Sequence, residues 1–389
     1  MATAAHVGIT RNQRRANGYE PEFQLLLACC RIEVDASEAA ALFAAPLNWE
    51  LVLKLAERHR LLAPLYTFLR EREDVPGSIR SAIRARFEGN ALRGLRFSAE
   101  LARIAGRFAD HKIDVLAHKG PALAQFLYGD PAMRQFGDLD FLVRVQDVSR
   151  AKALLRELSY ESRVQLSPRQ ERAYLRSGYE YVFGTHAEQN LLELQWQVLP
   201  RFYSIAFEME SLFERSVEIE VQGFRLRTLG KEDLMLVLCV HAAKHEWSQL
   251  GMVRDIAALA RWDVDWDWIE SEARRLGILR ILGISFLLGR NLVGVRMPEV
   301  MIEPGCEELA ARIQFSLVHE VKLETESLRY FRVMRRVRER WRDRVRLIWR
   351  LAITPSVGEW QAIRIPDSLF PLYRGVRAVR LLRRLCSRS

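Results

Sequence analysis

The segment from Ile113 to Val143 constrains the fold most, because its hydrophobic pattern differs from the helical periodicity around it. It begins with IDVLAH, a short apolar run with β-branched residues that meets Lys119 and Gly120. PALAQFLYG follows with helical spacing, and Pro121 suits a first helical position. After the loop GDPAMRQFG, DLDFLVR reads as a buried strand. The segment therefore predicts a strand, a glycine turn, a helix and a second strand.

Helical periodicity dominates on both sides of this unit. EFQLLLACCRI, NWELVLKLAERHRLLAPLYTFLRERE and SAELARIAGRFADHK precede it, and helical spacing returns from GKEDLMLVLCVHAAKHEW to about Glu320. Between them, YEYVFGTHAEQNLLELQWQV predicts a β-hairpin with Glu193 on a strand. We expect an α+β fold in which a small mixed sheet is embedded between largely helical regions. The expected divisions are a flexible tail (1–18), an N-terminal helical region (19–110), an α/β core (111–225), a helical domain (226–325) and a basic C-terminal region (326–389).

Composition favours a globular cytoplasmic protein. The chain has 389 residues, of which 49% are hydrophobic, and this length suffices for two or three domains. No apolar run approaches the roughly 20 residues that span a bilayer, since ILGISFLLG is bracketed by Arg280 and Arg290. The first residues lack the apolar stretch of a signal peptide. The five cysteines have no metal-binding spacing, which suits a reducing compartment.

The net charge of +10 is concentrated at the C-terminal end. Residues 329–389 contain 17 Arg or Lys against 4 Asp or Glu, whereas the first 328 residues contain 42 against 45. RYFRVMRRVRERWRDRVRLIWR has apolar residues at helical spacing and predicts one amphipathic helix with an arginine face. Three interpretations stay open: a solvated helix docked by its apolar stripe, a site for a phosphate-rich partner, and a membrane-surface helix. The apolar stripe comprises Phe331, Met334, Val337, Trp341, Val345 and Ile348.

Two carboxylates interrupt the apolar strand DLDFLVR. Strand alternation puts Asp138 and Asp140 on one face, where their repulsion is costly unless a cation lies between them. Mg²⁺ favours such a site, completed by waters and substrate phosphates. Glu193 on a neighbouring strand is the candidate third ligand, with Glu188 as a competitor, and would allow a second metal ion to bind. The alternatives are structural roles, in capping or on a solvated surface.

The turn before the first helix is a candidate phosphate site. Gly120 lets backbone N–H groups approach a ligand closely, and the start of the following helix favours an anion. Lys119 and Arg134 are candidate contacts to triphosphate oxygens. Each has a structural alternative. Lys119 could lie on the surface, and Arg134 could form a salt bridge with Asp138 or Asp140.

Together these motifs resemble the uncharacterised bacterial nucleotidyltransferase family of the DNA polymerase beta-like superfamily. The matching strings are L-x-x-K-G, L-Y-x-D-P and R-x-x-x-D-x-D-x-L-V, and the likeness is strongest from about Ile113 to Leu259. LELQWQV is similar to the strand that carries the family's third carboxylate, and LCVHAAKHEWSQLGMVRDIAAL to its characteristic helix. Two positions depart from the pattern. Pro121 lies where the wider superfamily has Ser or Gly, and Gln195 lies where relatives often have His. The resemblance implies transfer of a nucleoside monophosphate from a nucleoside triphosphate to an acceptor.

The resemblance also directs attention to three residues of the later helix. His241, Lys244 and His245 share one helical face, and the family likeness implies contacts from them to substrate phosphate or base. Interior histidines are the structural alternative. A zinc site is disfavoured because Ala242 follows His241 where the metalloprotease pattern has Glu, and no third ligand is evident.

The sequence therefore predicts a metal-dependent nucleotidyltransferase. Asp138, Asp140 and Glu193 are expected to bind two Mg²⁺ or Mn²⁺ ions, with ATP or another nucleoside triphosphate as substrate. The acceptor stays open among a small molecule, a peptide and an RNA. The alternative is a non-catalytic protein that keeps the fold and binds nucleotide or RNA.

Overall fold

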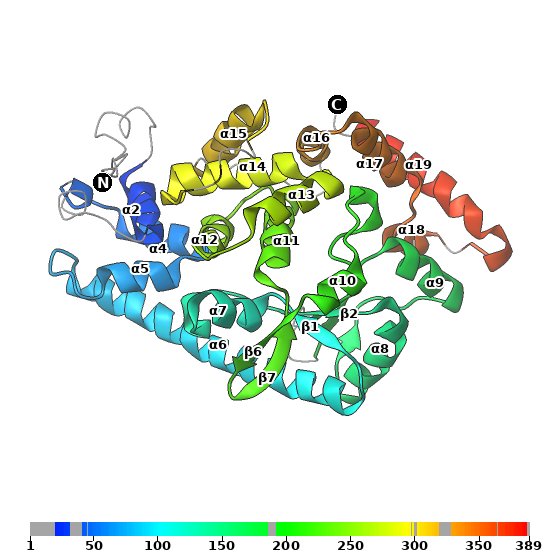
Figure 1. The fold of residues 1–389 in the computed structure, drawn as a ribbon, viewed down its shortest axis with the longest axis horizontal. Helices are drawn as coiled ribbons and strands as arrows, with labels where there is room; N and C mark the ends of the chain where they lie inside the picture. Colours follow the sequence, from blue (N-terminus) through cyan, green and yellow to red (C-terminus); the bar gives the residue numbers. More distant parts are fainter. Residues whose placement is uncertain are drawn as a thin grey trace.

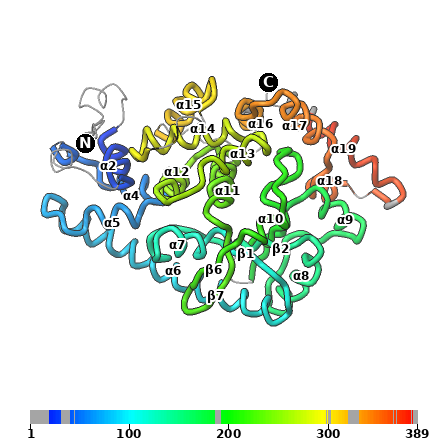
Figure 2. Tube along the Cα trace, in the orientation of Figure 1, coloured from blue at the N-terminus to red at the C-terminus, as the bar shows by residue number. Residues whose placement is uncertain are grey.

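The computed structural model describes residues 20–31, 41–44, 46–185, 192–296, 298, 302–318, 328–363 and 365–386. The fold is α+β, as predicted, with a small mixed sheet among many helices (Figure 1). The N-terminal helices lie at one end of the molecule and the C-terminal helices at the other (Figure 2). Within the described residues, no helix is both long and apolar enough to cross a bilayer.

The central segment forms the predicted strand, turn, helix and strand. These are β1 (Val115–Ala117), α7 (Gly120–Tyr128) and β2 (Leu139–Val143). Pro121 lies in the first turn of α7, and Gly129 ends the helix in the left-handed conformation. β2 begins at Leu139, so that Asp138 directly precedes the strand and Asp140 lies within it.

The predicted hairpin is also confirmed. β4 (Glu180–Gly184) and β5 (Leu192–Gln195) pair antiparallel, and β5 pairs parallel with β2. With the short β3 (Glu161–Ser162), the sheet order is β1-β2-β5-β4-β3. A separate hairpin consists of β6 (Val217–Val221) and β7 (Phe224–Thr228).

Strand alternation gives the sheet two different faces. Leu139, Phe141 and Val143 enter a core with α6 (Gly77–Asp110) and α8 (Val148–Glu157). Leu142 enters the larger core on the opposite side, with residues of α7 and α11 (Lys231–Lys244). Asp140 lies two residues from Leu142 and therefore faces α7 and α11.

Most of the remaining helices complete the large core around α11. Residues from the N-terminal helices, the α/β unit and the later helices enter one continuous hydrophobic cluster. The contributing helices are α2 (Pro21–Cys30), α4 (Trp49–Arg58), α5 (Leu62–Leu69), α10 (Met209–Glu214), α12 (Leu250–Leu259), α13 (Trp266–Leu276), α14 (Leu279–Leu288), α15 (Cys306–Val318), α16 (Leu328–Arg336) and α17 (Trp341–Ile353), with the short η3 (Arg201–Tyr203). α9 (Pro168–Ser177) packs against the smaller core instead. The described residues of η1 (Pro131–Met133), α18 (Val357–Ala362), η6 (Asp367–Leu372) and α19 (Tyr373–Cys386) lie outside the large cluster.

The prediction of one continuous basic amphipathic helix is wrong. The chain breaks between α16 and α17, where the guanidinium of buried Arg338 donates hydrogen bonds to the backbone carbonyls of Gly277 and Tyr203. The predicted apolar stripe is divided by this break. Met334 and Val337 are buried, whereas Trp341, Val345 and Ile348 are exposed. Tertiary hydrogen bonds to Arg338 thus override local helical periodicity.

Candidate active site

Acidic side chains from three neighbouring strands lie on the face of the sheet that α7 and α11 cover. Asp140 of β2 lies in register with Glu193 of β5. Glu180 of β4 is the register partner of Gln195, two residues beyond Glu193. Because side chains at i and i+2 share a face, Glu180, Glu193 and Gln195 extend the acidic group from Asp140 across three strands. The structure thus places Glu193 beside Asp140.

Lys119 neutralises the most buried of these carboxylates. Its Nζ atom lies 2.6 Å from Oδ1 of Asp140, whose side chain is 1% exposed. Gln195 Nε2 donates to the same Asp140 oxygen at 3.1 Å and to Glu193 Oε2 at 2.7 Å. The ammonium and the amide together hold the two carboxylates in place. Of the two alternatives for Lys119, a surface position does not apply, since its side chain is 13% exposed.

Burial and these contacts separate the pKa values of the acids. Burial opposes ionisation of Asp140, but the Lys119 ammonium outweighs it and lowers the pKa of Asp140 to about 2. Burial and the Asp140 carboxylate raise the pKa of Glu193 to about 9. Burial, with Asp140 adding to it, also raises the pKa of Asp138. At neutral pH the metal-free site therefore has an ionised Asp140 and a protonated Glu193.

A second basic residue approaches the same face from α11. Lys244 Nζ donates to the Tyr179 hydroxyl at 2.7 Å, and that hydroxyl donates to Glu180. Burial lowers the pKa of Lys244, while the Glu180 and Glu193 carboxylates oppose this change. Lys244 is thus linked to the acidic group through a tyrosine.

The turn at Gly120 is fixed by sterics. Its φ is +54°, and a Cβ atom at this position would lie 2.6 Å from the backbone oxygen of Asp138. Glycine is therefore required on two counts, conformation and close approach. This contact brings the start of α7 against the chain just before β2, next to both aspartates.

Arg134 has a structural partner other than the expected one. Its Nε lies 2.8 Å from Oδ2 of Asp255 in α12, and Tyr128 donates to the other oxygen of Asp255 at 2.7 Å. The predicted alternative, a salt bridge with Asp138 or Asp140, is wrong, because a buried carboxylate of a distant helix competes for the guanidinium.

The two histidines of the later helix lie close together near this site. The ring centroids of His241 and His245 are 4.7 Å apart. Burial lowers the pKa of both, to about 3 for His245, so both are neutral at pH 7. His118, next to Lys119, is buried with no partner for Nδ1.

The oxygen-rich group suits a hard divalent cation in its chemistry. Gln195 Oε1 and Glu180 Oε2 are buried without a hydrogen-bond partner, and Asp140 and Glu193 supply carboxylate oxygens. Among the described residues, however, no three His, Cys, Asp or Glu side chains converge closely enough to hold a metal ion. Lys119 and Gln195 both donate to Oδ1 of Asp140. The competitor Glu188 lies outside the described residues.

Several contacts at this site escape sequence reasoning. Tyr179 and Glu180 lie in the predicted hairpin, and Asp255, the partner of Arg134, lies in the family-like helix, but the sequence assigned none of the three to the site. Strand alternation was the one usable signal, because Glu180 lies at an inward position of the predicted hairpin. Nothing local to the sequence could have linked Arg134 to Asp255, which is 121 residues away.

Comparison with known proteins identifies a family. The profile of a protein family described as "Uncharacterised nucleotidyltransferase" matches residues 45–294, more than half of the chain. No curated protein matches significantly.

Two solved structures are similar. The structure of ANT(2")-Ia in complex with adenylyl-2"-tobramycin is 12% identical, with a TM-score of 0.34, and the match covers 46% of this chain and 95% of that chain. An antigenic nucleotidyltransferase-like protein from Paracoccidioides brasiliensis is 15% identical, with a TM-score of 0.29, and the match covers 46% of this chain and 86% of that one.

Proposed function

Because the chain belongs to the family of uncharacterised nucleotidyltransferases, we propose that it moves a nucleoside monophosphate from a nucleoside triphosphate to a hydroxyl or phosphate acceptor. In this reaction an acceptor oxygen attacks the α-phosphorus, and the bond from that phosphorus to pyrophosphate breaks. ATP is the first nucleotide to test. The buried free thiols of Cys29, Cys30, Cys239 and Cys306 support our proposal of a cytoplasmic location.

The register of Asp140 with Glu193 is the observation that carries this proposal. A parallel strand pair holds two carboxyl groups side by side on a buried face, where two negative charges together would destabilise the fold. Burial and the neighbouring Asp140 carboxylate therefore raise the pKa of Glu193 and keep it protonated at neutral pH. Such an arrangement is typical of a site that binds a cation.

We propose that Asp138, Asp140 and Glu193 bind two Mg²⁺ or Mn²⁺ ions. These ions would supply positive charge to the triphosphate and activate the acceptor oxygen. Glu193 must release its proton before it can serve as a ligand, and we propose that Lys119 leaves Oδ1 of Asp140 when the ions bind. Glu193 is also our candidate for the group that takes the acceptor's proton.

We assign the triphosphate to the basic and backbone groups around α7 and α11. Lys119, once displaced from Asp140, and the first turn of α7 after Gly120 lie beside the acids. Lys244 and the two neutral histidines, His241 and His245, are our candidates for contacts to phosphate or base. Arg134 would serve the triphosphate only by leaving Asp255, so we give it a supporting role, fixing α12 against the loop before β2.

The proposal is tested with the variants Asp140→Asn and Glu193→Gln. Both should abolish Mg²⁺-dependent ATP binding and transfer of label from α-labelled ATP, while circular dichroism shows a folded chain. Asp114→Asn is the matched control, because Asp114 pairs with Arg144 and Arg227 outside the acidic group. Retention of Mg²⁺-dependent nucleotide binding by both site variants would overturn the proposal.

One observation favours a second candidate, a non-catalytic protein that keeps the fold. Lys119 and Gln195 already satisfy Asp140 and bridge it to Glu193 without any metal ion. This candidate predicts nucleotide or RNA binding that is equal in EDTA and in Mg²⁺. No transfer of label to any component of a cell extract would accompany it.

A further inference from the structure

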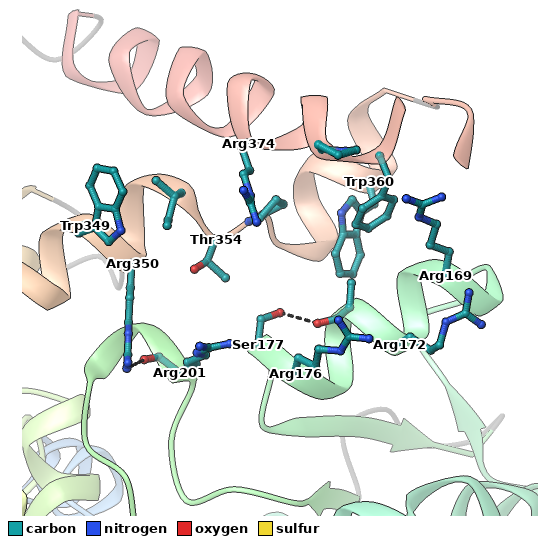
Figure 3. A pocket seen from close by; sticks show the side chains of 15 residues that line it. Arg169, Arg172, Arg176, Ser177, Arg201, Trp349, Arg350, Thr354, Trp360 and Arg374 are labelled. Atoms are coloured by element: carbon teal, nitrogen blue, oxygen red, sulfur yellow. Dashed lines mark hydrogen bonds between the residues drawn. The ribbon is translucent and has the colours of Figure 1, made fainter. Parts of the chain in front are cut away.

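An arginine-lined cleft lies apart from the carboxylates. Its volume is about 650 Å³, and α9, η3, α17, α18, η6 and α19 surround it (Figure 3). Three segments far apart in sequence therefore form its walls. No Asp or Glu is among the described residues that line it. The lining arginines are Arg169, Arg172, Arg176, Arg201, Arg350 and Arg374.

These six guanidinium groups have no acidic partners. Within the described part of the chain, none of them forms an ion pair, although most other arginines with partners pair with Asp or Glu. Arg350 donates only to the backbone oxygen of Arg201, at 3.1 Å, and Arg169 lies over the Phe370 ring at 5.2 Å. The cleft thus concentrates positive charge that no ion pair neutralises within the described part of the chain. Its ligand must be strongly anionic.

Aromatic side chains lie among the arginines. Trp349 is 63% exposed, so its ring is accessible to a ligand in the cleft. Trp360 is 4% exposed, and its indole N–H is buried without a hydrogen-bond partner. Phe370 lies beside it, with ring centroids 6.1 Å apart. The cleft therefore offers the exposed face of Trp349 beside the arginines, with Trp360 and Phe370 packed in its wall.

We propose that this cleft binds a single-stranded oligonucleotide, which, on the function proposed above, is the acceptor. Arginines contact successive phosphates, and exposed aromatic rings stack on bases. A single phosphate would leave most of the six charges unpaired. A duplex presents its bases inside the helix, out of reach of the rings, and a bilayer needs an apolar face that meets it without a recess.

One helix connects the cleft to the acidic group. Tyr174 of α9 packs edge-on against Trp360, with ring centroids 6.2 Å apart, and its hydroxyl donates to the backbone oxygen of Glu180 at 2.8 Å. The Trp196 indole, next to Gln195, donates to the backbone oxygen of Leu175 at 3.1 Å. A strand bound in the cleft would therefore lie against the helix that abuts β4 and β5. Its terminal hydroxyl would form the bond to the α-phosphorus as pyrophosphate leaves and Glu193 takes the proton.

Binding is tested in EDTA without nucleotide, so that the outcome does not depend on catalysis. Fluorescence anisotropy of an unstructured labelled RNA of about ten nucleotides is measured with the full chain, from about 50 to about 200 mM salt. The triple variant Arg172→Ala/Arg176→Ala/Arg374→Ala should bind at least about tenfold more weakly. The negative slope of the logarithm of the association constant against the logarithm of the salt concentration should become shallower by about two. Single-stranded DNA of the same sequence distinguishes RNA from DNA as the ligand.

Two controls separate the cleft from general surface charge. Arg84→Ala/Arg93→Ala/Arg107→Ala removes as many charges from α6 and should bind like the native chain. Trp349→Ala should weaken binding about tenfold, and Trp349→Tyr should restore most of it. Equal losses in the two triple variants, equal affinity for duplex RNA, or no affinity of the native chain at low salt would each overturn the binding site.

The acceptor role has its own readout. Asp140→Asn should keep oligonucleotide binding and lose transfer of label, whereas the cleft variant should lose transfer to the oligonucleotide but keep Mg²⁺-dependent ATP binding. An oligonucleotide with a blocked terminal hydroxyl should bind and stay unlabelled. Binding without any labelling of the free-hydroxyl strand, by a chain that labels another acceptor, would overturn the acceptor role alone.

Discussion

At the residue scale, Lys119 determines the charge balance of the acidic group. Its ammonium is the one basic group hydrogen-bonded to Asp140 among the described residues, and Asp140 is almost fully buried. A buried carboxylate without a partner is strongly destabilising. Lys119 therefore acts in the metal-free protein as the cation that the acids require.

Lys119→Met keeps side-chain length and removes this charge. We expect a loss of about 3–5 kcal/mol in the free energy of unfolding in EDTA, because Asp140 is left buried and unpaired. Millimolar Mg²⁺ should restore part of this loss, measured by urea unfolding. Lys152→Met breaks an ion pair with Glu171 and is the matched control, whose loss should not respond to Mg²⁺. An equal Mg²⁺ response of the two variants would contradict cation binding by the acids.

Glu193 gives the metal-free protein a pH dependence of defined sign. Its pKa is about 9 in the folded chain and near 4.3 when unfolded, so the folded state binds the proton more tightly. Its contribution to stability is therefore complete below about pH 4.3 and is lost as pH rises toward 9, by at most about 1.4 kcal/mol per pH unit.

Thermal unfolding in EDTA between about pH 6 and about pH 9 checks this prediction. The native chain should lose stability as pH rises, and Glu193→Gln should lose less, because its amide does not ionise. The pH dependence that Asp140 gives to stability has the opposite sign. Because the pKa of Asp140 is lowered, its contribution to stability is present above about pH 4 and is lost as pH falls toward 2. Identical pH profiles for the native chain and Glu193→Gln would contradict the raised pKa of Glu193.

At the element scale, the turn into α7 sets the distance between helix and strand. Gly120 contacts the backbone of Asp138 so closely that any side chain there would push α7 away from β2. Lys119 precedes this glycine, and its reach to Asp140 depends on that approach. The phosphate-turn prediction for Gly120 therefore coincides with a steric requirement of the fold.

Gly120→Ala should destabilise the chain by at least about 2 kcal/mol, from a positive φ together with a clash against backbone. Gly129→Ala is the matched control at the other end of α7. Gly129 also has a positive φ, +70°, but nothing lies within 4 Å of its added Cβ, so only about 1 kcal/mol is expected. Chemical denaturation measures both, and equal losses would show that the Asp138 contact is unimportant.

At the scale of the whole molecule, the C-terminal region is part of the fold. Tyr330, Met334 and Val337 enter the same core as the N-terminal and central helices. Arg338 ties the break between α16 and α17 to Gly277 and Tyr203. The basic character predicted from composition thus lies on helices that are anchored by buried residues.

A chain that ends before Tyr330 should lose roughly 5 kcal/mol or more of unfolding free energy, since four buried side chains, those of Tyr330, Met334, Val337 and Leu347, are removed from the main core. A chain that ends after Thr354 keeps these residues and should lose less. Thermal midpoints of the two truncations provide the measurement. Equal midpoints would mean that α16 contributes nothing to the core.

The local architecture of the active-site unit could be predicted because each signal is short in range. The apolar runs, Pro121 and Gly120 specify a strand, turn and helix within about 15 residues, and the hairpin predicted for β4 and β5 forms as expected. The break after Arg336 could not be predicted, because helical periodicity continues through it while the hydrogen bonds that stop the helix come from Gly277 and Tyr203.

By itself the sequence determined the elements of the α/β unit, the spacing of Asp138 and Asp140, and the presence of Glu193 on another strand, because alternation and turn chemistry act between near neighbours. Only the tertiary structure decided the partners: Lys119 for Asp140, Asp255 for Arg134, and six arginines of three segments around one cleft. These pairings depend on how helices and strands pack across long chain separations, where a charge is satisfied by whichever group is brought nearest to it.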